Sequence, residues 1–175
     1  MSNANDELAV QHFVDYLRIK TVQPLPDYEK AFEFLQSYAM ELDLNYQKIQ
    51  VGIDRHVAIL TWLSTNNSQQ QQTLLLNSHI DVVPVFEEHW KYSPFGGEIV
   101  DGRIYGRGAQ DMKCVGIQYL EAIRRLKLAN YKPNRTVHCL FVPDEEIGGL
   151  TGMNKFIEMD EFKQLNVGFT LDEGK

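Results

Sequence analysis

Three short apolar runs, each followed at once by acidic or imidazole side chains, constrain the fold of this chain most strongly. The runs are residues 73–76, 136–142 and 167–171, and their length and composition are typical of strands buried on both faces of a sheet. Between the first two runs, the apolar residues of segment 112–128 recur at helical spacing. Strands that alternate with helices predict an α/β fold, with a mostly parallel sheet flanked by helices.

The N-terminal part of the sequence predicts two helices and a strand pair. Apolar residues spaced along one helical face indicate the first helix around residues 10–17, with Asp6 as its N-cap, and Asp27 is the expected N-cap of the second helix. Segments 46–51 and 57–63 are expected to pair across a turn at residues 52–54. In the later helix, the apolar face is expected to comprise Val115, Tyr119, Ala122, Ile123 and Leu126.

Side chains suited to metal binding or proton transfer follow each of the three apolar runs. His79 and Asp81 come after the first run, Glu145 and Glu146 after the second, and Asp172 after the third. The carboxyl ends of the strands in an open α/β sheet border its ligand crevice. We therefore expect these side chains to converge on one site.

Asp111, which lies just before the predicted helix at 112–128, is a further candidate for this site. Carboxylates that lie close together repel one another unless a cation compensates them. One imidazole with several carboxylates suits Zn²⁺, which accepts nitrogen and oxygen donors, whereas Ca²⁺ prefers oxygen alone. If Asp111 is shared between ions, a two-metal site becomes possible. Of the neighbouring Glu145 and Glu146, one can bind metal while the other acts as a general base.

Each candidate also has a purely structural interpretation. His79 and Asp81 can form a capping pair at a strand end, Asp111 can be a simple helix N-cap, and the two glutamates can be solvated acids at a helix start. The other histidines and both cysteines are expected to be packed or exposed side chains rather than ligands or nucleophiles. These residues are His12, His56, His89, His138, Cys114 and Cys139.

Charge and hydropathy narrow the class of protein. With 24 acidic and 17 basic residues, the net charge is −7, which argues against a nucleic-acid partner, because phosphate binding requires clustered Lys and Arg. No apolar run approaches the ~20 residues that span a bilayer, and the first residues lack the features of a signal peptide. We expect a soluble, cytoplasmic protein with no membrane partner.

Three motifs carry a resemblance to a known family: SHIDVVP at residues 78–84, GRGAQDMK at 106–113 and PDEEIGG at 143–149. In this order they resemble the M20 metallopeptidase family, whose members are co-catalytic dizinc hydrolases. Three further segments, TVQP at 21–24, DMKC at 111–114 and TLDEG at 170–174, are most similar to the aminoacylase-1 branch of that family.

The resemblance implies a set of ligands for two zinc ions. His79 would bind one zinc together with Asp172. Asp111 would bridge the two zincs, and Glu146 would bind the other.

The roles of the two remaining acids and the reaction also follow from the resemblance. Glu145 would deprotonate the attacking water and then pass a proton to the leaving amine, while Asp81 would orient the His79 imidazole. The implied reaction is hydrolysis of the amide bond of small-molecule N-acyl-L-amino acids to a carboxylate and a free L-amino acid. A dipeptidase of the same family is the alternative.

The resemblance also implies that this chain is one part of a larger protein. Family members are longer, with a lid and dimerisation domain that interrupts the catalytic domain, and a later histidine completes the second zinc site. Residues 1–175 are therefore expected to form the N-terminal segment of the zinc-binding catalytic domain, without the lid and dimerisation domain or the C-terminal part. Full-length members are expected to be homodimers. A non-catalytic fragment or short isoform is the alternative for this chain.

Overall fold

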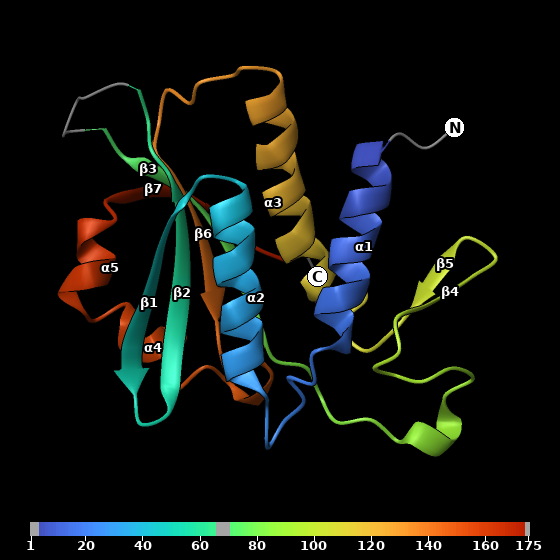
Figure 1. Ribbon diagram of the computed structural model, residues 1–175. Helices are drawn as coiled ribbons and strands as arrows, with labels where there is room; N and C mark the ends of the chain where they lie inside the picture. The colour runs from blue at the N-terminus through green and yellow to red at the C-terminus, as the bar shows by residue number, and fades with distance from the viewer. Residues whose placement is uncertain (1–3, 66–70, 174–175) are drawn as a thin grey trace.

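The computed structural model of the chain describes residues 4–65 and 71–173 (Figure 1). As expected, each of the three apolar runs forms a strand. In chain order the elements are α1 (Ala4–Arg18), α2 (Tyr28–Glu41), β1 (Asn45–Gly52), β2 (Arg55–Trp62), β3 (Thr73–His79), the 3₁₀ turn η1 (Glu87–His89), β4 (Glu98–Val100), β5 (Arg103–Tyr105), α3 (Lys113–Leu128), β6 (Val137–Val142), the 3₁₀ turn η2 (Glu145–Ile147), α4 (Met153–Phe156), α5 (Asp160–Gln164) and β7 (Val167–Leu171).

A five-stranded sheet with the order β1-β2-β6-β3-β7 forms the centre of the fold. Strand β3 pairs in parallel with both β6 and β7, while β2 pairs antiparallel with β1 and β6. Strand β2 therefore runs opposite to the other four strands of this sheet. The prediction of an α/β fold with a mostly parallel, helix-flanked sheet is confirmed.

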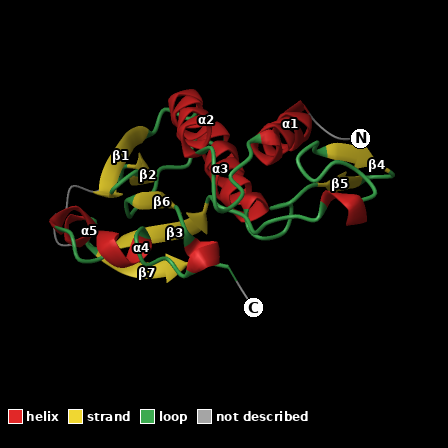
Figure 2. Cartoon of the chain, turned by 90° about the horizontal axis from the view of Figure 1, so that it is seen from below, coloured by secondary structure: helices red, strands yellow, loops and turns green. Residues whose placement is uncertain are grey.

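Helices cover both faces of the sheet, which gives three layers (Figure 2). Alternate residues of the central strands supply a core to each face, because successive side chains of a strand point to opposite sides. In β2, Ala58 and Leu60 pack toward α2 and α3, whereas Val57 and Ile59 pack with Phe156 of α4 on the other face. Helix α1 packs against α3, and the β4–β5 hairpin lies beyond it, away from the sheet (Figure 2).

The structure corrects two details of the helix predictions. Helix α1 begins at Ala4, so Asp6 lies in its first turn rather than at its N-cap. In α3 the buried residues are Lys113, Gly116, Ile117, Leu120, Glu121, Ile123 and Arg124. This face shares Ile123 with the predicted one but otherwise differs, because α3 buries charged side chains that have partners on α1 and α2. Arg124, for example, forms an ion pair with Glu41 of α2 at 2.8 Å.

Other local predictions are confirmed. The Asp27 carboxylate accepts a hydrogen bond from the Lys30 backbone N–H at the start of α2, and β1 and β2 form the expected hairpin. The edge strand β7 differs from prediction, because most of its side chains are exposed and Phe169 is 62% accessible. Among the described helices, none is both long and apolar enough to cross a bilayer.

Candidate metal centre

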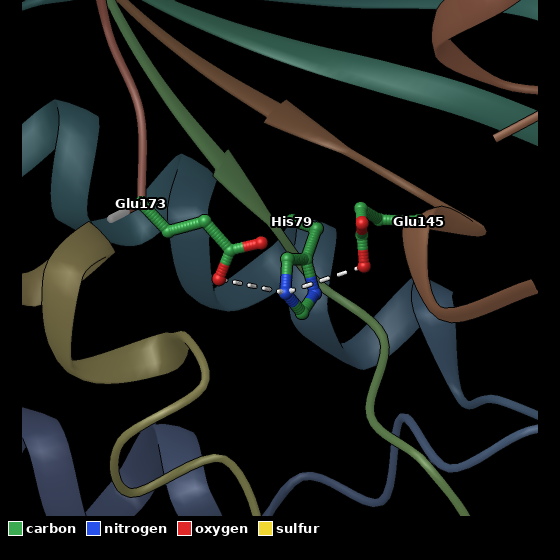
Figure 3. Close-up of side chains that lie close together, drawn as sticks. All are labelled: His79, Glu145 and Glu173. Atoms are coloured by element: carbon green, nitrogen blue, oxygen red, sulfur yellow. Dashed lines mark ion pairs between the residues drawn. The ribbon is translucent and has the colours of Figure 1, made fainter. Parts of the chain in front are cut away.

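The carboxyl ends of β3, β6 and β7 meet at one edge of the sheet, where the predicted side chains gather. His79 is the last residue of β3, Glu145 begins the turn that follows β6, and Glu173 follows β7. Figure 3 shows the two glutamates on either side of the imidazole, with Glu145 Oε2 3.8 Å and Glu173 Oε2 4.0 Å from His79 Nε2. The parallel arrangement of these three strands therefore brings His79, Glu145 and Glu173 to one edge of the sheet, although Glu173 is not among the predicted site residues.

The His79 ring is buried, with a side-chain exposure of 1%, and both of its nitrogens have partners. Nδ1 donates to the Asp81 backbone carbonyl at 2.9 Å, which directs Nε2 toward Asp111 Oδ1 at 2.8 Å. Burial disfavours the charged ring, but Asp81 and Asp111 outweigh this effect and raise the pKa of His79 to about 9. A metal ion can replace the proton at Nε2, because only the neutral ring offers a lone pair there.

Asp81 links the histidine to the two glutamates that follow β6. Its fully buried carboxylate accepts hydrogen bonds from the backbone N–H groups of Glu145, at 3.0 Å, and Glu146, at 3.2 Å. The same carboxylate lies 3.5 Å from His79 Nδ1. Asp81 thus contacts the imidazole through its backbone carbonyl and its carboxylate, and it also fixes the start of the η2 turn.

Two overlapping groups of side chains have the composition and spacing of metal sites. One comprises His79, Asp111 and Glu146, and the other comprises His79, Glu145 and Glu173. Within each group, one potential ligand atom per residue lies within 4.8 Å of the others. Imidazole with carboxylates is a donor set that zinc accepts, so the residues present fit a divalent metal of this kind.

The pKa shifts of the acidic side chains also indicate a site suited to a cation. Burial raises the pKa of the Glu146 carboxyl, and the negative charge of Asp111 raises it further. The pKa of Glu173 is raised for the same two reasons, in the same order. Within the described part of the chain, no Lys or Arg forms an ion pair with any of these three acids. A bound cation would relieve the repulsion among them.

Asp172, the predicted ligand after β7, has a different position from Glu173. Its Oδ2 accepts a hydrogen bond from the Asn77 side-chain amide at 2.9 Å, and its Oδ1 accepts one from the Glu173 backbone N–H. Asp172 is in neither metal-type group, whereas Glu173, its neighbour, is in one of them. The strand ends at Leu171, and no feature of the sequence distinguishes these two consecutive acids. Gly174 lies outside the described residues.

The Asp111 carboxylate points toward His79 instead of capping the helix. Helix α3 begins at Lys113, with Met112 at the N-cap position and no side-chain cap. The Lys113 ammonium is buried and donates to the Tyr16 carbonyl at 3.0 Å and the Ile19 carbonyl at 2.7 Å. Burial lowers the pKa of Lys113 to about 7. This lysine ties the segment that carries Asp111 to the end of α1, a role that its sequence position alone does not reveal.

The histidines and cysteines that we expect to be structural lie outside both metal-type groups. His12 Nε2 lies 3.2 Å from Glu41 Oε2, and His138 Nδ1 lies 2.9 Å from the Thr61 hydroxyl oxygen. Neither His56 nor His89 belongs to a metal-type group in the described structure. The half-buried Cys114 donates to the Gln110 carbonyl, and burial raises the pKa of its thiol. A raised thiol pKa disfavours a nucleophilic role.

A cavity of about 610 Å³ adjoins the metal-type groups and includes Asp111 and Glu173 in its wall. Trp90, Tyr105 and Arg107 contribute to the same wall, and the Arg107 guanidinium stacks on the Trp90 ring, 5.4 Å from its centroid. Arg107 is the one basic side chain among the described residues that line this cavity. The cavity therefore offers space beside the acidic centre together with one positive charge.

Comparison with known proteins identifies a family. Residues 75–174 match the family model described as Peptidase family M20/M25/M40. Among curated relatives, aminoacylase-1 of Sus scrofa is 55% identical and that of Homo sapiens 53% identical, each over 95% of this chain and 40% of the relative. Aminoacylase-1 of Dictyostelium discoideum is 42% identical over 99% of the chain. The chain thus spans about 40% of the length of these relatives.

Solved structures share the fold at low sequence identity. An M20 family metallo-carboxypeptidase, Sso-CP2 from Sulfolobus solfataricus, superposes with a TM-score of 0.82 at 23% identity, over 99% of this chain and 38% of that one. Human carnosine dipeptidase 1 superposes with a TM-score of 0.78 at 19% identity, over 95% of this chain and 38% of that one.

Proposed function

The chain belongs to peptidase family M20/M25/M40, and on this basis we propose that it forms the N-terminal segment of a zinc-dependent catalytic domain. The proposed reaction is hydrolysis of the amide bond of N-acyl-L-amino acids to a carboxylate and a free L-amino acid. The observation that carries the proposal is the pair of metal-type groups that share His79. We further propose that the whole protein acts in the cytoplasm as a homodimer, with a lid and dimerisation domain outside these 175 residues.

Two zinc ions are proposed for the complete site. His79 and Glu173 would hold one ion, Glu146 would hold the other, and Asp111 would bridge them. This assignment draws on both metal-type groups and leaves Glu145, the remaining member, to act on the attacking water. Glu173 replaces the sequence-predicted Asp172 in this assignment, because the Asp172 carboxylate is engaged by Asn77. When bound, zinc supplies polarisation of the scissile carbonyl and a lower pKa for the attacking water.

Glu145 is the proposed general base. Its side chain is 49% exposed, so a water molecule can reach it, and its carboxylate lies beside His79. The carboxylate would accept a proton from the attacking water, hold it, and donate it to the nitrogen of the leaving amine as the carbon–nitrogen bond breaks. Asp81 holds the Glu145 backbone N–H, which keeps the base in place during both proton transfers.

The substrate class is proposed from the relatives and the cavity. The curated relatives reported above are named aminoacylase-1 and reach 55% identity, whereas the dipeptidase structure is 19% identical. The cavity beside Asp111 contains Arg107, whose positive charge favours a substrate that bears a carboxylate. An N-acyl amino acid carries such a carboxylate next to its amide bond.

The test is Glu145→Gln in the protein expressed from its full reading frame, with Glu161→Gln as an exposed control of the same chemistry. Turnover of N-acetyl-L-methionine should fall at least about 100-fold in Glu145→Gln, while bound zinc, measured by elemental analysis, should be unchanged. Near-normal turnover in this variant would contradict the assignment of the base. Faster hydrolysis of dipeptides than of N-acetyl amino acids would favour the dipeptidase alternative. Zinc binding without any hydrolysis by the 175-residue chain would favour the non-catalytic alternative.

A further inference from the structure

Gln23 lies in the TVQP segment, which none of the proposed catalytic steps uses. Residues 21–23 run beside the residues that follow His79 as a short parallel bridge between Val22 and Val82. The Gln23 backbone N–H donates to the Val82 carbonyl at 3.0 Å, and the Val82 N–H donates to the Thr21 carbonyl at 3.1 Å. This pairing places Gln23, a residue that is 5% exposed, inside the molecule next to Asp81.

The buried Gln23 amide donates two hydrogen bonds at the edge of the metal centre. One goes to Asp81 Oδ2 at 2.8 Å and the other to the Tyr28 hydroxyl oxygen at 3.1 Å. The same hydroxyl oxygen accepts the Asp144 backbone N–H at 3.1 Å. Gln23 therefore donates to the Asp81 carboxylate and the Tyr28 hydroxyl, and both of these groups also accept hydrogen bonds from the backbone just after β6.

Three consecutive backbone N–H groups at the end of β6 depend on these two acceptors. The Asp144 N–H points to Tyr28, whereas the Glu145 and Glu146 N–H groups point to the Asp81 carboxylate. Among the described residues, no Lys or Arg forms an ion pair with Asp81. The side chains that contact the Asp81 carboxylate are those of His79 and Gln23.

From this geometry we infer that Gln23 is a positioning residue for the metal centre. It fixes the Asp81 carboxylate and the Tyr28 hydroxyl, and through them it sets the backbone from which Glu145 and Glu146 project. The inference rests on the proposed function only for the identity of the metal that these acids bind. Gln23 itself belongs neither to the metal-type groups nor to the described residues that line the cavity.

Loss of the Gln23 amide has a defined physical consequence. The Asp81 carboxylate keeps its two backbone donors but loses the side-chain donor that restrains Oδ2, so the Glu145–Glu146 turn becomes looser. Removal of a residue that orients metal ligands typically lowers metal affinity 10–100-fold. Because Gln23 acts one step further out, we expect about a tenfold loss of zinc affinity, at the lower end of that range.

The test compares Gln23→Met, which keeps the length of the side chain but not its donor, with Gln50→Met, the same change at an exposed site. Zinc affinity of the 175-residue chain is measured by competition with a chromophoric chelator, and amide exchange of Glu145 and Glu146 is measured without metal. Gln23→Met should weaken zinc binding about tenfold and speed exchange at both amides, whereas Gln50→Met should change neither.

A double-mutant cycle separates positioning from general destabilisation. In an Asp81→Asn background, Gln23→Met should weaken zinc binding no further, because its effect passes through the Asp81 carboxylate. Additive losses, or unchanged affinity and exchange in the single variant, would overturn the inference. If Gln23→Met does not fold, Tyr28→Phe replaces it: faster exchange at Asp144 is expected, and unchanged exchange there would also overturn the inference. None of these measurements needs hydrolysis, so their outcome is independent of whether the proposed reaction occurs.

Discussion

Mild acid should weaken the fold through His138, the buried histidine of β6. Its Nδ1 is hydrogen-bonded to the Thr61 hydroxyl at 2.9 Å, and the ring also has a hydrogen bond with the Leu165 backbone. Burial lowers the pKa of His138 to about 4, from an ordinary value of 6.5. The unfolded chain therefore binds a proton at a higher pH than the folded chain does. Stability that is present above pH 6.5 is lost as the pH falls toward 4.

The two pKa values set the size of this loss. Each unit of difference between the His138 pKa of the folded chain and that of the unfolded chain corresponds to about 1.36 kcal/mol of unfolding free energy, once the ring has titrated in both states. Between about pH 7.5 and about pH 5.5 the unfolded ring becomes largely protonated while the folded ring stays neutral, and the free energy of unfolding should fall by about 1.4 kcal/mol from this residue alone.

The assay is urea unfolding, followed by circular dichroism at the two pH values, for the wild type and for His138→Gln, which does not titrate. The loss of unfolding free energy in the wild type should exceed that in His138→Gln by about 1.4 kcal/mol. His89→Gln, which removes an exposed histidine, should behave as the wild type. Equal losses in the wild type and His138→Gln would refute the reasoning.

Three further predictions concern packing and metal binding. Gly116→Ala should lower the unfolding free energy by about 1–3 kcal/mol, although alanine has the better helix propensity. The reason is steric, because the added Cβ would lie 2.8 Å from Phe141 Cε1 and 3.0 Å from Ser78 Oγ. A variant that is more stable than the wild type in thermal unfolding would contradict this prediction. In chelator competition, Glu173→Gln should weaken zinc binding by roughly tenfold or more, whereas Asp172→Asn should change it little. A larger loss of zinc affinity in Asp172→Asn than in Glu173→Gln would identify Asp172 as the ligand instead. Free zinc at about 100 times its Kd should raise the Tm of the chain by about 5 °C or more, and EDTA should reverse the shift; an unchanged Tm would mean that the folded chain does not bind zinc.

The sequence predicts the strands and the convergence of their ends because both follow from strong local patterns. The apolar runs of β3 and β6 and the acids that follow them are short, continuous and bounded, so topology alone brings His79 and Glu145 together. The buried face of α3 is harder to predict, because Lys113 and Arg124 are buried only where carbonyls and carboxylates from α1 and α2 meet them. Periodicity of apolar residues contains no information about such partners.

Two features of the site also escape prediction for physical reasons. Asp172 and Glu173 are consecutive acids at the end of a strand, and the Asp172 carboxylate, which accepts hydrogen bonds from Asn77 and from the Glu173 backbone N–H, is the one outside the metal-type groups. Gln23 acts across 58 residues of sequence through one hydrogen bond to Asp81. A contact of this kind depends on how the segment after α1 pairs with the end of β3, which appears only in the folded chain.

The central claim is that His79 and the surrounding strand-end acids hold zinc. Anomalous diffraction at the zinc edge, from crystals of the 175-residue chain grown with zinc, tests it most directly. We predict an anomalous peak about 2.0–2.1 Å from His79 Nε2, with Asp111 as a ligand of the same ion and Glu173 closer to the peak than Asp172. A zinc-containing crystal without a peak at His79, or with its peaks only at other side chains, would contradict the account.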